Sequence, residues 1–213
     1  MKQCSINDVV IQPLRERVKQ VTREAILEAA RAVFSERGFG GARVEEIAER
    51  AGVAVGTLYN YFDDRRAILD AVLDASAHLL AARLAEGRLP STAGLAPQLE
   101  RFLSVAVEEV EASYPLYAVV FEEALEGGRG SAARRRGPPL LLAVHEAAEQ
   151  IVKEAVRAGT LRPEDASLYP ALLVGMLRGM LMRHLCIDAG PPLSSYVAPL
   201  TRFFLEGAAR RPT

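Results

Sequence analysis

The stretch from residue 44 to residue 62, VEEIAERAGVAVGTLYNYF, constrains the fold of this chain more than any other segment. Ile47 and Ala48 form an inward-facing pair on a first short helix, and the small Ala48 allows a second helix to approach closely. Gly52 provides the backbone freedom of a sharp turn, and Leu58 belongs to the apolar face of the next short helix. The spacing therefore predicts two short helices that cross steeply and are joined by a turn of about three or four residues.

The rest of the chain is also patterned for helices. Ala, Leu, Glu and Arg dominate, and the long alternation of β-branched residues that indicates strands is missing, so an all-α fold is expected. Gly38 should end the first helix as a left-handed cap, and Asp63 and Asp64 should cap the fourth. Helices are predicted at residues 14–37, 44–51, 55–62, 64–86, 95–112, 114–126, 138–158, 163–187 and 194–208.

Composition excludes several classes of protein. The chain has 213 residues, of which 50% are hydrophobic and 25% charged, which suits a folded core and argues against disorder. No run of 18 uncharged apolar residues is present, and the N-terminus lacks a signal-peptide core, so a cytoplasmic protein without membrane contact is expected. The formal net charge of −1 neither favours nor excludes nucleic acid as a partner.

The sequence carries no pattern that predicts catalysis or a cofactor. The serine-hydrolase, zinc-protease and Walker motifs are missing, so the chain is not expected to be an enzyme. Two cysteines, Cys4 and Cys186, are too few for a disulfide framework, and the three histidines are too dispersed to hold a metal.

The outer face of the second short helix carries side chains that are small or able to form hydrogen bonds. Such a face suits a helix that enters the major groove of DNA. Its members are Val55, Gly56, Thr57, Asn60 and Tyr61.

The segment from Phe34 to Leu69 resembles the N-terminal DNA-binding domain of the TetR family of bacterial transcriptional regulators. The resemblance covers these 36 residues, whereas the C-terminal part of the chain matches only in helix number and length. The matching motifs are Gly38-Phe39, Ile47-Ala48, Ala51-Gly52-Val53, Gly56-Thr57-Leu58-Tyr59, Tyr61-Phe62, and then Arg65, Ile68 and Leu69.

The resemblance implies a three-part organisation. An N-terminal arm over residues 1–20 precedes a three-helix DNA-binding domain over residues 21–66. A long helix joins this domain to a helical ligand-binding and dimerisation domain over residues 67–213. The expected function is that of a ligand-responsive regulator, most commonly a repressor, which binds a pseudo-palindromic double-stranded DNA operator as a dimer and is released by a small-molecule inducer.

Site residues follow from the same resemblance. Two interpretations of Tyr59 stay open, base contact or core aromatic, and Asn60 is either a base contact or a plain exposed residue. The phosphate-contacting set is expected to be Thr57, Tyr61 and Arg65, and the base-facing set Val55, Gly56, Tyr59 and Asn60.

Two departures from the family pattern weaken the helix starts. Ala42-Arg43 stands where Ser or Thr usually caps the first short helix, although Arg43 can contact phosphate instead. Ala54-Val55 stands where Ser usually opens the second. A protein-interaction module with a decayed helix-turn-helix is therefore the alternative. The basic residues of the arm can lie along a phosphate backbone, reach into a minor groove, or form a solvated helix start. They are Arg15, Arg17, Lys19 and Arg23.

The C-terminal domain is expected to pair with a second copy and to hold the effector. A dimer would match two half-sites, and the last two helices are the expected interface, with Gly175 and Gly179 permitting close approach. The effector is expected to be small and apolar or amphipathic, although most candidate lining residues could equally be core. The candidates are Phe102, Tyr114, Tyr117, Phe121, His145, Met176 and Met180.

Overall fold

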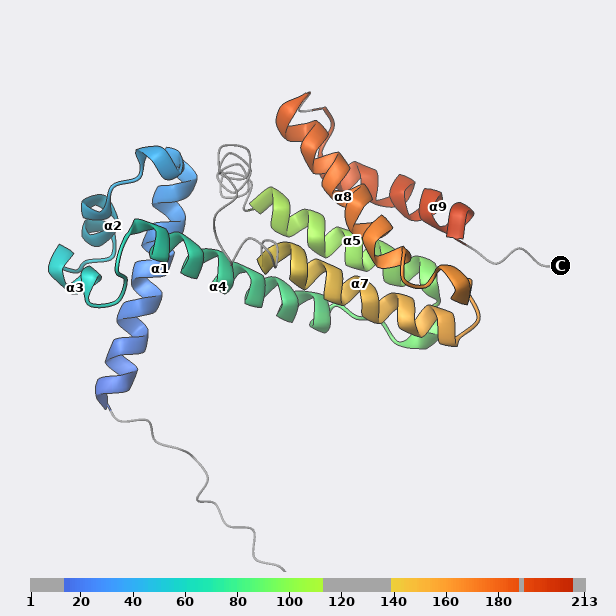
Figure 1. The fold of residues 1–213 in the computed structure, drawn as a ribbon, viewed down its shortest axis with the longest axis horizontal. Coiled ribbons are helices and arrows are strands. Elements are labelled where there is room, and N and C mark those ends of the chain that lie inside the picture. The colour runs from blue at the N-terminus through green and yellow to red at the C-terminus, as the bar shows by residue number, and fades with distance from the viewer. Residues whose placement is uncertain (1–13, 113–138, 188–189, 209–213) are drawn as a thin grey trace, which may run out of the picture. The chain divides into compact units, whose positions relative to one another are not determined.

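The structure, a computed structural model, describes residues 14–112, 139–187 and 190–208 (Figure 1). These residues form α-helices and short 3₁₀ helices, and no strand occurs among them, so the all-α prediction is confirmed. The chain divides into two compact units, an N-terminal unit up to Val72 and a C-terminal unit from Leu73. The predicted helix at residues 114–126 lies outside the described residues.

The N-terminal unit contains α1 (Leu14–Gly41), α2 (Val44–Arg50), α3 (Val55–Tyr59) and the first turns of α4 (Arg65–Glu86). Regular helix geometry in α1 is interrupted at Gly38, whose φ of 66° is reserved almost wholly for glycine. The predicted break at this glycine is therefore confirmed, but its ψ of 172° is not that of a left-handed cap, and α1 runs on to Gly41. The core of the unit is built from Ile26, Ala30, Val33, Phe34, Ile47, Ala48, Leu58, Ile68 and Leu69, all nearly inaccessible to solvent.

The start of α4 is fixed by a side-chain cap. The backbone N–H of Ala67 donates to Oδ1 of Asp64 over 2.7 Å, as predicted from the paired aspartates. α4 is continuous across the boundary between the two units, because that boundary falls between Val72 and Leu73.

The C-terminal unit adds α5 (Leu95–Ala112), α7 (Pro139–Arg157), α8 (Tyr169–Cys186) and α9 (Val197–Ala208). α5 packs against α7 and α9, and α7 also packs against α8 (Figure 1). The rings of Tyr169 and Phe204 join α8 to α9 edge to face, with centroids 5.7 Å apart. The core is lined by the apolar faces of these helices, including Leu99, Leu103, Ala148 and Leu173.

The predicted helix at residues 163–187 is wrong at its beginning. A 3₁₀ turn, Pro163–Asp165, comes first, and α8 begins only at Tyr169. Pro170 lies in the first turn of α8, where its missing N–H needs no partner, so this proline marks a start rather than an interior.

Among the described residues, no helix is long and apolar enough to cross a membrane. The same part of the chain holds no cluster of His, Cys, Asp and Glu suited to a metal ion.

Candidate DNA interface and effector cavity

The helix-turn-helix is held together by backbone contacts and small residues. Gly52 has a φ of 69°, which lets the chain turn sharply after α2. The N–H of Val53 then donates to the carbonyl of Ala48 over 3.0 Å, closing the turn onto α2. Leu58 is fully buried, so α3 presents its opposite side outward.

The departures at the helix starts are visible in the structure. Arg43 and Ala54 occupy the N-cap positions of α2 and α3, and neither provides a side-chain hydrogen bond to the helix. Both helices therefore begin without the stabilisation of about 1 kcal/mol that Ser, Thr, Asp or Asn usually gives.

The outward side of α3 bears the predicted DNA-contacting residues. Gly56 and Asn60 are exposed, and Thr57 and Tyr61 are half-buried. Tyr59 is 49% exposed, so its ring is not part of the core. These positions leave the α3 side chains free to meet a partner surface, while their roles stay predictions.

A shallow groove of about 490 Å³ joins the start of α1 to the end of α3. Its basic wall is Arg15 and Lys19, four residues apart on one face of α1. Its other wall contains the predicted contact residues Thr57, Asn60 and Tyr61. The structure thus brings two cations of the predicted arm beside the recognition helix. The sequence indicated basic residues there, but not which of them would lie against α3.

Arg65 is engaged inside the N-terminal unit. Its Nη1 donates to the carbonyl of Ala42 over 2.8 Å, and its guanidinium carbon lies 4.4 Å from the centre of the Phe39 ring. The neighbouring Arg66 pairs with Asp70 over 2.9 Å. Arg43, by contrast, is exposed and has no ion-pair or hydrogen-bond partner for its side chain among the described residues.

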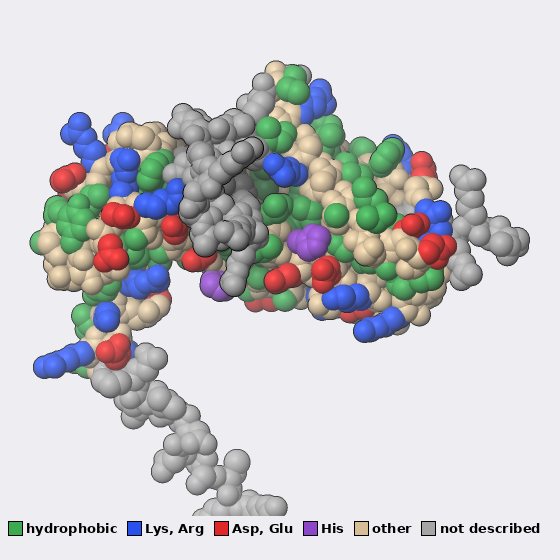
Figure 2. All heavy atoms as spheres, in the orientation of Figure 1, with side chains coloured by type: hydrophobic (Ala, Val, Ile, Leu, Met, Phe, Trp, Pro, Cys, Tyr) green, Lys and Arg blue, Asp and Glu red, His purple; other side chains and the backbone are tan. Residues whose placement is uncertain are grey.

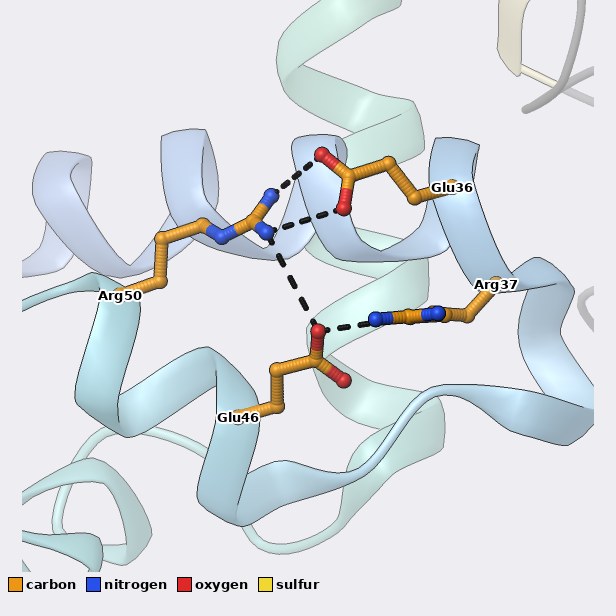
Figure 3. A network of polar contacts seen from close by, with 4 residues as sticks. All are labelled: Glu36, Arg37, Glu46 and Arg50. Carbon is orange, nitrogen blue, oxygen red and sulfur yellow. Dashed lines mark hydrogen bonds and ion pairs between the residues drawn. The ribbon is translucent and has the colours of Figure 1, made fainter.

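An ion-pair network fastens α1 to α2 (Figure 3). Arg50 donates two hydrogen bonds to the carboxylate of Glu36, over 2.6 and 2.9 Å. Arg37 lies 3.5 Å from the Glu46 carboxylate. The hydrogen bond from Arg50 lowers the pKa of Glu36 below its ordinary value, and the same bond raises the pKa of Arg50. Arg37 and Arg50 are therefore paired with carboxylates of the same unit.

This pairing shows which charges of the N-terminal unit stay available to a partner, although positive and negative charges there are nearly equal in number. Residues 1–66 hold eleven Lys and Arg against ten Asp and Glu. The network neutralises Glu36 and Glu46, whereas exposed Arg15, Arg17 and Lys19 have no partner among the described residues. Basic and acidic side chains are accordingly interspersed on the face of the N-terminal unit seen in Figure 2.

A cavity of about 230 Å³ lies in the C-terminal unit between the end of α4, α5 and α7. Its wall is mainly apolar, with Leu84, Phe102, Val105 and Ile151, and Arg101 adds a charged group. The predicted lining residue Phe102 thus borders a real cavity.

The other candidate lining residues lie elsewhere. The imidazole of His145 faces Glu149, with Nε2 3.6 Å from its carboxylate, and does not line this cavity. Met176 and Met180 are half-buried on α8, which does not border it. Tyr114, Tyr117 and Phe121 lie outside the described residues.

α8 and α9 leave apolar side chains exposed. Leu172 is 54% and Phe203 71% exposed, and Figure 2 shows hydrophobic side chains on the surface of this unit. Gly175 and Gly179 lie on α8 with open space where a Cβ would stand. Another helix could therefore approach this face closely.

Comparison with known proteins relates these features to one family. Residues 26–72 match the family described as bacterial regulatory proteins, tetR family. The HTH-type transcriptional regulator UidR of Escherichia coli K12 is 26% identical over 163 residues, which cover 76% of this chain and 81% of UidR. The HTH-type transcriptional repressor KstR2 of Rhodococcus jostii is 29% identical over 105 residues, covering 49% of this chain and 51% of KstR2.

The whole fold has solved counterparts. The regulator FadR of Bacillus subtilis, solved in complex with stearoyl-CoA, matches with a TM-score of 0.72 and 21% identity, over 86% of this chain and 98% of that one. The matched residues 26–72 contain α2, the Gly52 turn and α3. The N-terminal segment of the chain therefore matches the tetR family of bacterial regulatory proteins, and the chain as a whole is similar to HTH-type transcriptional regulators.

Proposed function

We propose that this transcriptional regulator is a repressor that binds a pseudo-palindromic operator as a homodimer and is released by a small effector. The observation that carries the DNA-binding part is the exposed side of α3, which shares a groove with Arg15 and Lys19, two exposed cations without a partner among the described residues. Thr57 and Tyr61 would bond phosphate oxygens and Asn60 a base edge, while Val55, Gly56 and Tyr59 complete the base-facing surface. The match to the repressor KstR2 supports repression over activation.

Dimerisation is proposed to use α8 and α9. The exposed apolar Leu172 and Phe203, together with the open surface at Gly175 and Gly179, suit helix-on-helix packing between two copies. A symmetric pair would present two α3 helices to successive major grooves.

Effector response is proposed to travel along α4. This helix carries Arg65 in the N-terminal unit and the cavity residue Leu84 in the C-terminal unit. A ligand that displaces the cavity wall would move the same continuous helix that carries Arg65. Ligand and DNA would then oppose each other by a coupling of about 1–3 kcal/mol.

Binding of the full chain to random DNA, with sequencing of the bound fraction, tests the DNA-binding proposal. The expected outcome is a two-fold symmetric site. The Asn60→Ala variant should relax preference at one or two positions of each half-site, whereas Tyr61→Phe should weaken all sequences alike, because phosphate contacts carry no base information. An Asn60→Ala profile identical to the wild type would remove Asn60 from the base-facing set.

The same experiment decides the alternative, an interaction module with a decayed helix-turn-helix. The uncapped starts of α2 and α3 favour that alternative. Failure to enrich any site, with no fall of affinity as salt rises, would support it over the repressor.

A further inference from the structure

We propose that the C-terminal cavity takes a small organic carboxylate, with Arg101 as the residue that receives its charge. The inference builds on the proposed effector response and adds the chemical class of the ligand. Its starting point is a mostly apolar wall that includes one guanidinium without a partner among the described residues.

Arg101 differs from the other arginines near the cavity. Arg83 pairs with the carboxylates of Glu108 and Glu109, over 2.8 and 3.1 Å. Arg88 pairs with Glu154. Arg101 forms no ion pair or hydrogen bond within the part of the chain that the structure describes, so its charge is available to a ligand.

Arg101 is an exposed residue, and its guanidinium lies beside Gly87 at the end of α4. A Cβ added at Gly87 would lie 3.1 Å from Nε and 3.5 Å from Nη2 of Arg101. The side chain therefore fills the space that glycine leaves at the end of α4. That helix end attracts a cation, which orients the group without neutralising it.

Arg101 and Glu146 are the charged groups of the lining without an ion-pair partner among the described residues, because Arg88 pairs with Glu154. Two arginines, Arg88 and Arg101, and one carboxylate, Glu146, border the cavity, together with the neutral side chains of Gln98 and Gln150. Since Glu146 does not pair with Arg101, a ligand amine is the competing possibility. The planar guanidinium of arginine can donate two parallel hydrogen bonds to a carboxylate, so we favour a carboxylate over an amine as the ligand group.

The size of the cavity limits the ligand. A volume of about 230 Å³ equals the share of roughly eight water molecules in the liquid, at about 30 Å³ each. A body of about ten non-hydrogen atoms, such as octanoate, fits this volume. The apolar residues Leu84, Phe102 and Ile151 would cover its chain.

Calorimetric titration of the full chain with octanoate, octanamide and octylamine tests the proposal. Octanoate should bind about tenfold more tightly than octanamide, since a hydrogen bond to a charged group contributes at least about 1.5 kcal/mol. Arg101→Gln should abolish this preference and leave octanamide binding and the melting temperature unchanged. Arg101→Lys should retain part of it, and Arg157→Gln, on the exposed side of α7, should behave as the wild type.

Equal binding of acid and amide, tightest binding of octylamine, or no binding of octanoate at millimolar concentration would each overturn the proposal. DNA release is measured separately with a preformed operator complex. Octanoate that binds through Arg101 but does not release DNA would leave the carboxylate site standing and contradict the effector function. DNA release by other ligands, together with no binding of octanoate, would leave the effector function standing and contradict the carboxylate site.

Discussion

The guanidinium of Arg65 joins three segments of the N-terminal unit. It extends from the start of α4, bonds the Ala42 carbonyl before α2, and lies over the ring of Phe39 near the end of α1. Because these contacts are part-buried, Arg65→Ala should lower the free energy of unfolding by about 1–2 kcal/mol. Urea unfolding followed by circular dichroism measures the change.

Arg43→Ala is the matched control for Arg65. Its side chain is exposed and makes no cap to α2, so its stability should stay within about 0.5 kcal/mol of the wild type. Its DNA affinity should still fall if Arg43 contacts phosphate. An Arg65→Ala protein as stable as Arg43→Ala would show that the Ala42 and Phe39 contacts contribute nothing.

At the scale of single elements, the cap of α4 offers a comparison between adjacent residues of one type. Asp64 accepts a hydrogen bond from the Ala67 N–H, whereas the neighbouring Asp63 is exposed and makes no such cap. Asp64→Ala should therefore cost about 1 kcal/mol of stability and Asp63→Ala close to none, as judged from their urea midpoints. Equal effects would mean that helix-dipole charge, rather than the hydrogen bond, stabilises this start.

The junction of α1 and α2 should respond to acid. Its Glu36 carboxylate has a lowered pKa because Arg50 hydrogen-bonds the ionised form. A lowered pKa stabilises the fold above the ordinary carboxyl pKa, and this stabilisation disappears as the pH falls through the pKa of the folded state. Glu36→Gln should therefore lower the melting temperature slightly at pH 7 and match the wild type at strongly acidic pH.

Glu28→Gln, an exposed carboxylate of the same helix without a described partner, serves as the control for that pH series. It should leave the difference from the wild type flat across the same range. If the difference in melting temperature between Glu36→Gln and the wild type were also independent of pH, the Glu36–Arg50 ion pair would not stabilise the packing of α2 on α1.

Local signals explain why many element boundaries were predictable from the sequence. Gly38 and Asp64 act through their own backbone and side chain, so their effects can be inferred without knowing the fold. The beginning of α8 differs from the prediction because residues 163–168 form a 3₁₀ helix and a following turn, and only the position of Pro170 marks the true start. Helix boundaries that depend on one residue and its own turn can be predicted from the sequence. The start of α8 could not, because a 3₁₀ helix and a turn come before it.

The sites were less predictable because they depend on packing between elements. The exposed side of α3 follows from its own periodicity around buried Leu58. Lys19 shares a groove with Tyr61, and Arg65 donates a hydrogen bond to the Ala42 carbonyl, because of how α1 and α4 pack in the fold. Sequence spacing alone does not encode that packing. For the same reason, the sequence could not distinguish Phe102, which borders the cavity, from Met176, which does not.

At the scale of the whole molecule, a net charge of −1 requires that DNA affinity come from a small number of placed cations. Among its described residues, each N-terminal unit has four exposed Lys and Arg side chains without an ion-pair or hydrogen-bond partner, namely Arg15, Arg17, Lys19 and Arg43. In the proposed dimer, these four cations of each subunit allow about eight charged phosphate contacts. The slope of log affinity against log salt should be no steeper than about −7.

Removal of one of these cations should make the salt slope shallower by about one unit for each phosphate contact that is lost. Lys19→Ala should reduce it by about two in the dimer, one for each subunit, and should weaken operator and unrelated DNA by similar factors. Arg37→Ala should leave the slope unchanged, because Arg37 is already paired with Glu46. Fluorescence anisotropy with labelled operator across a salt series measures both. If Lys19→Ala kept the wild-type slope while Arg37→Ala lowered it, the cations of the ion-pair network, rather than those of the groove, would face DNA.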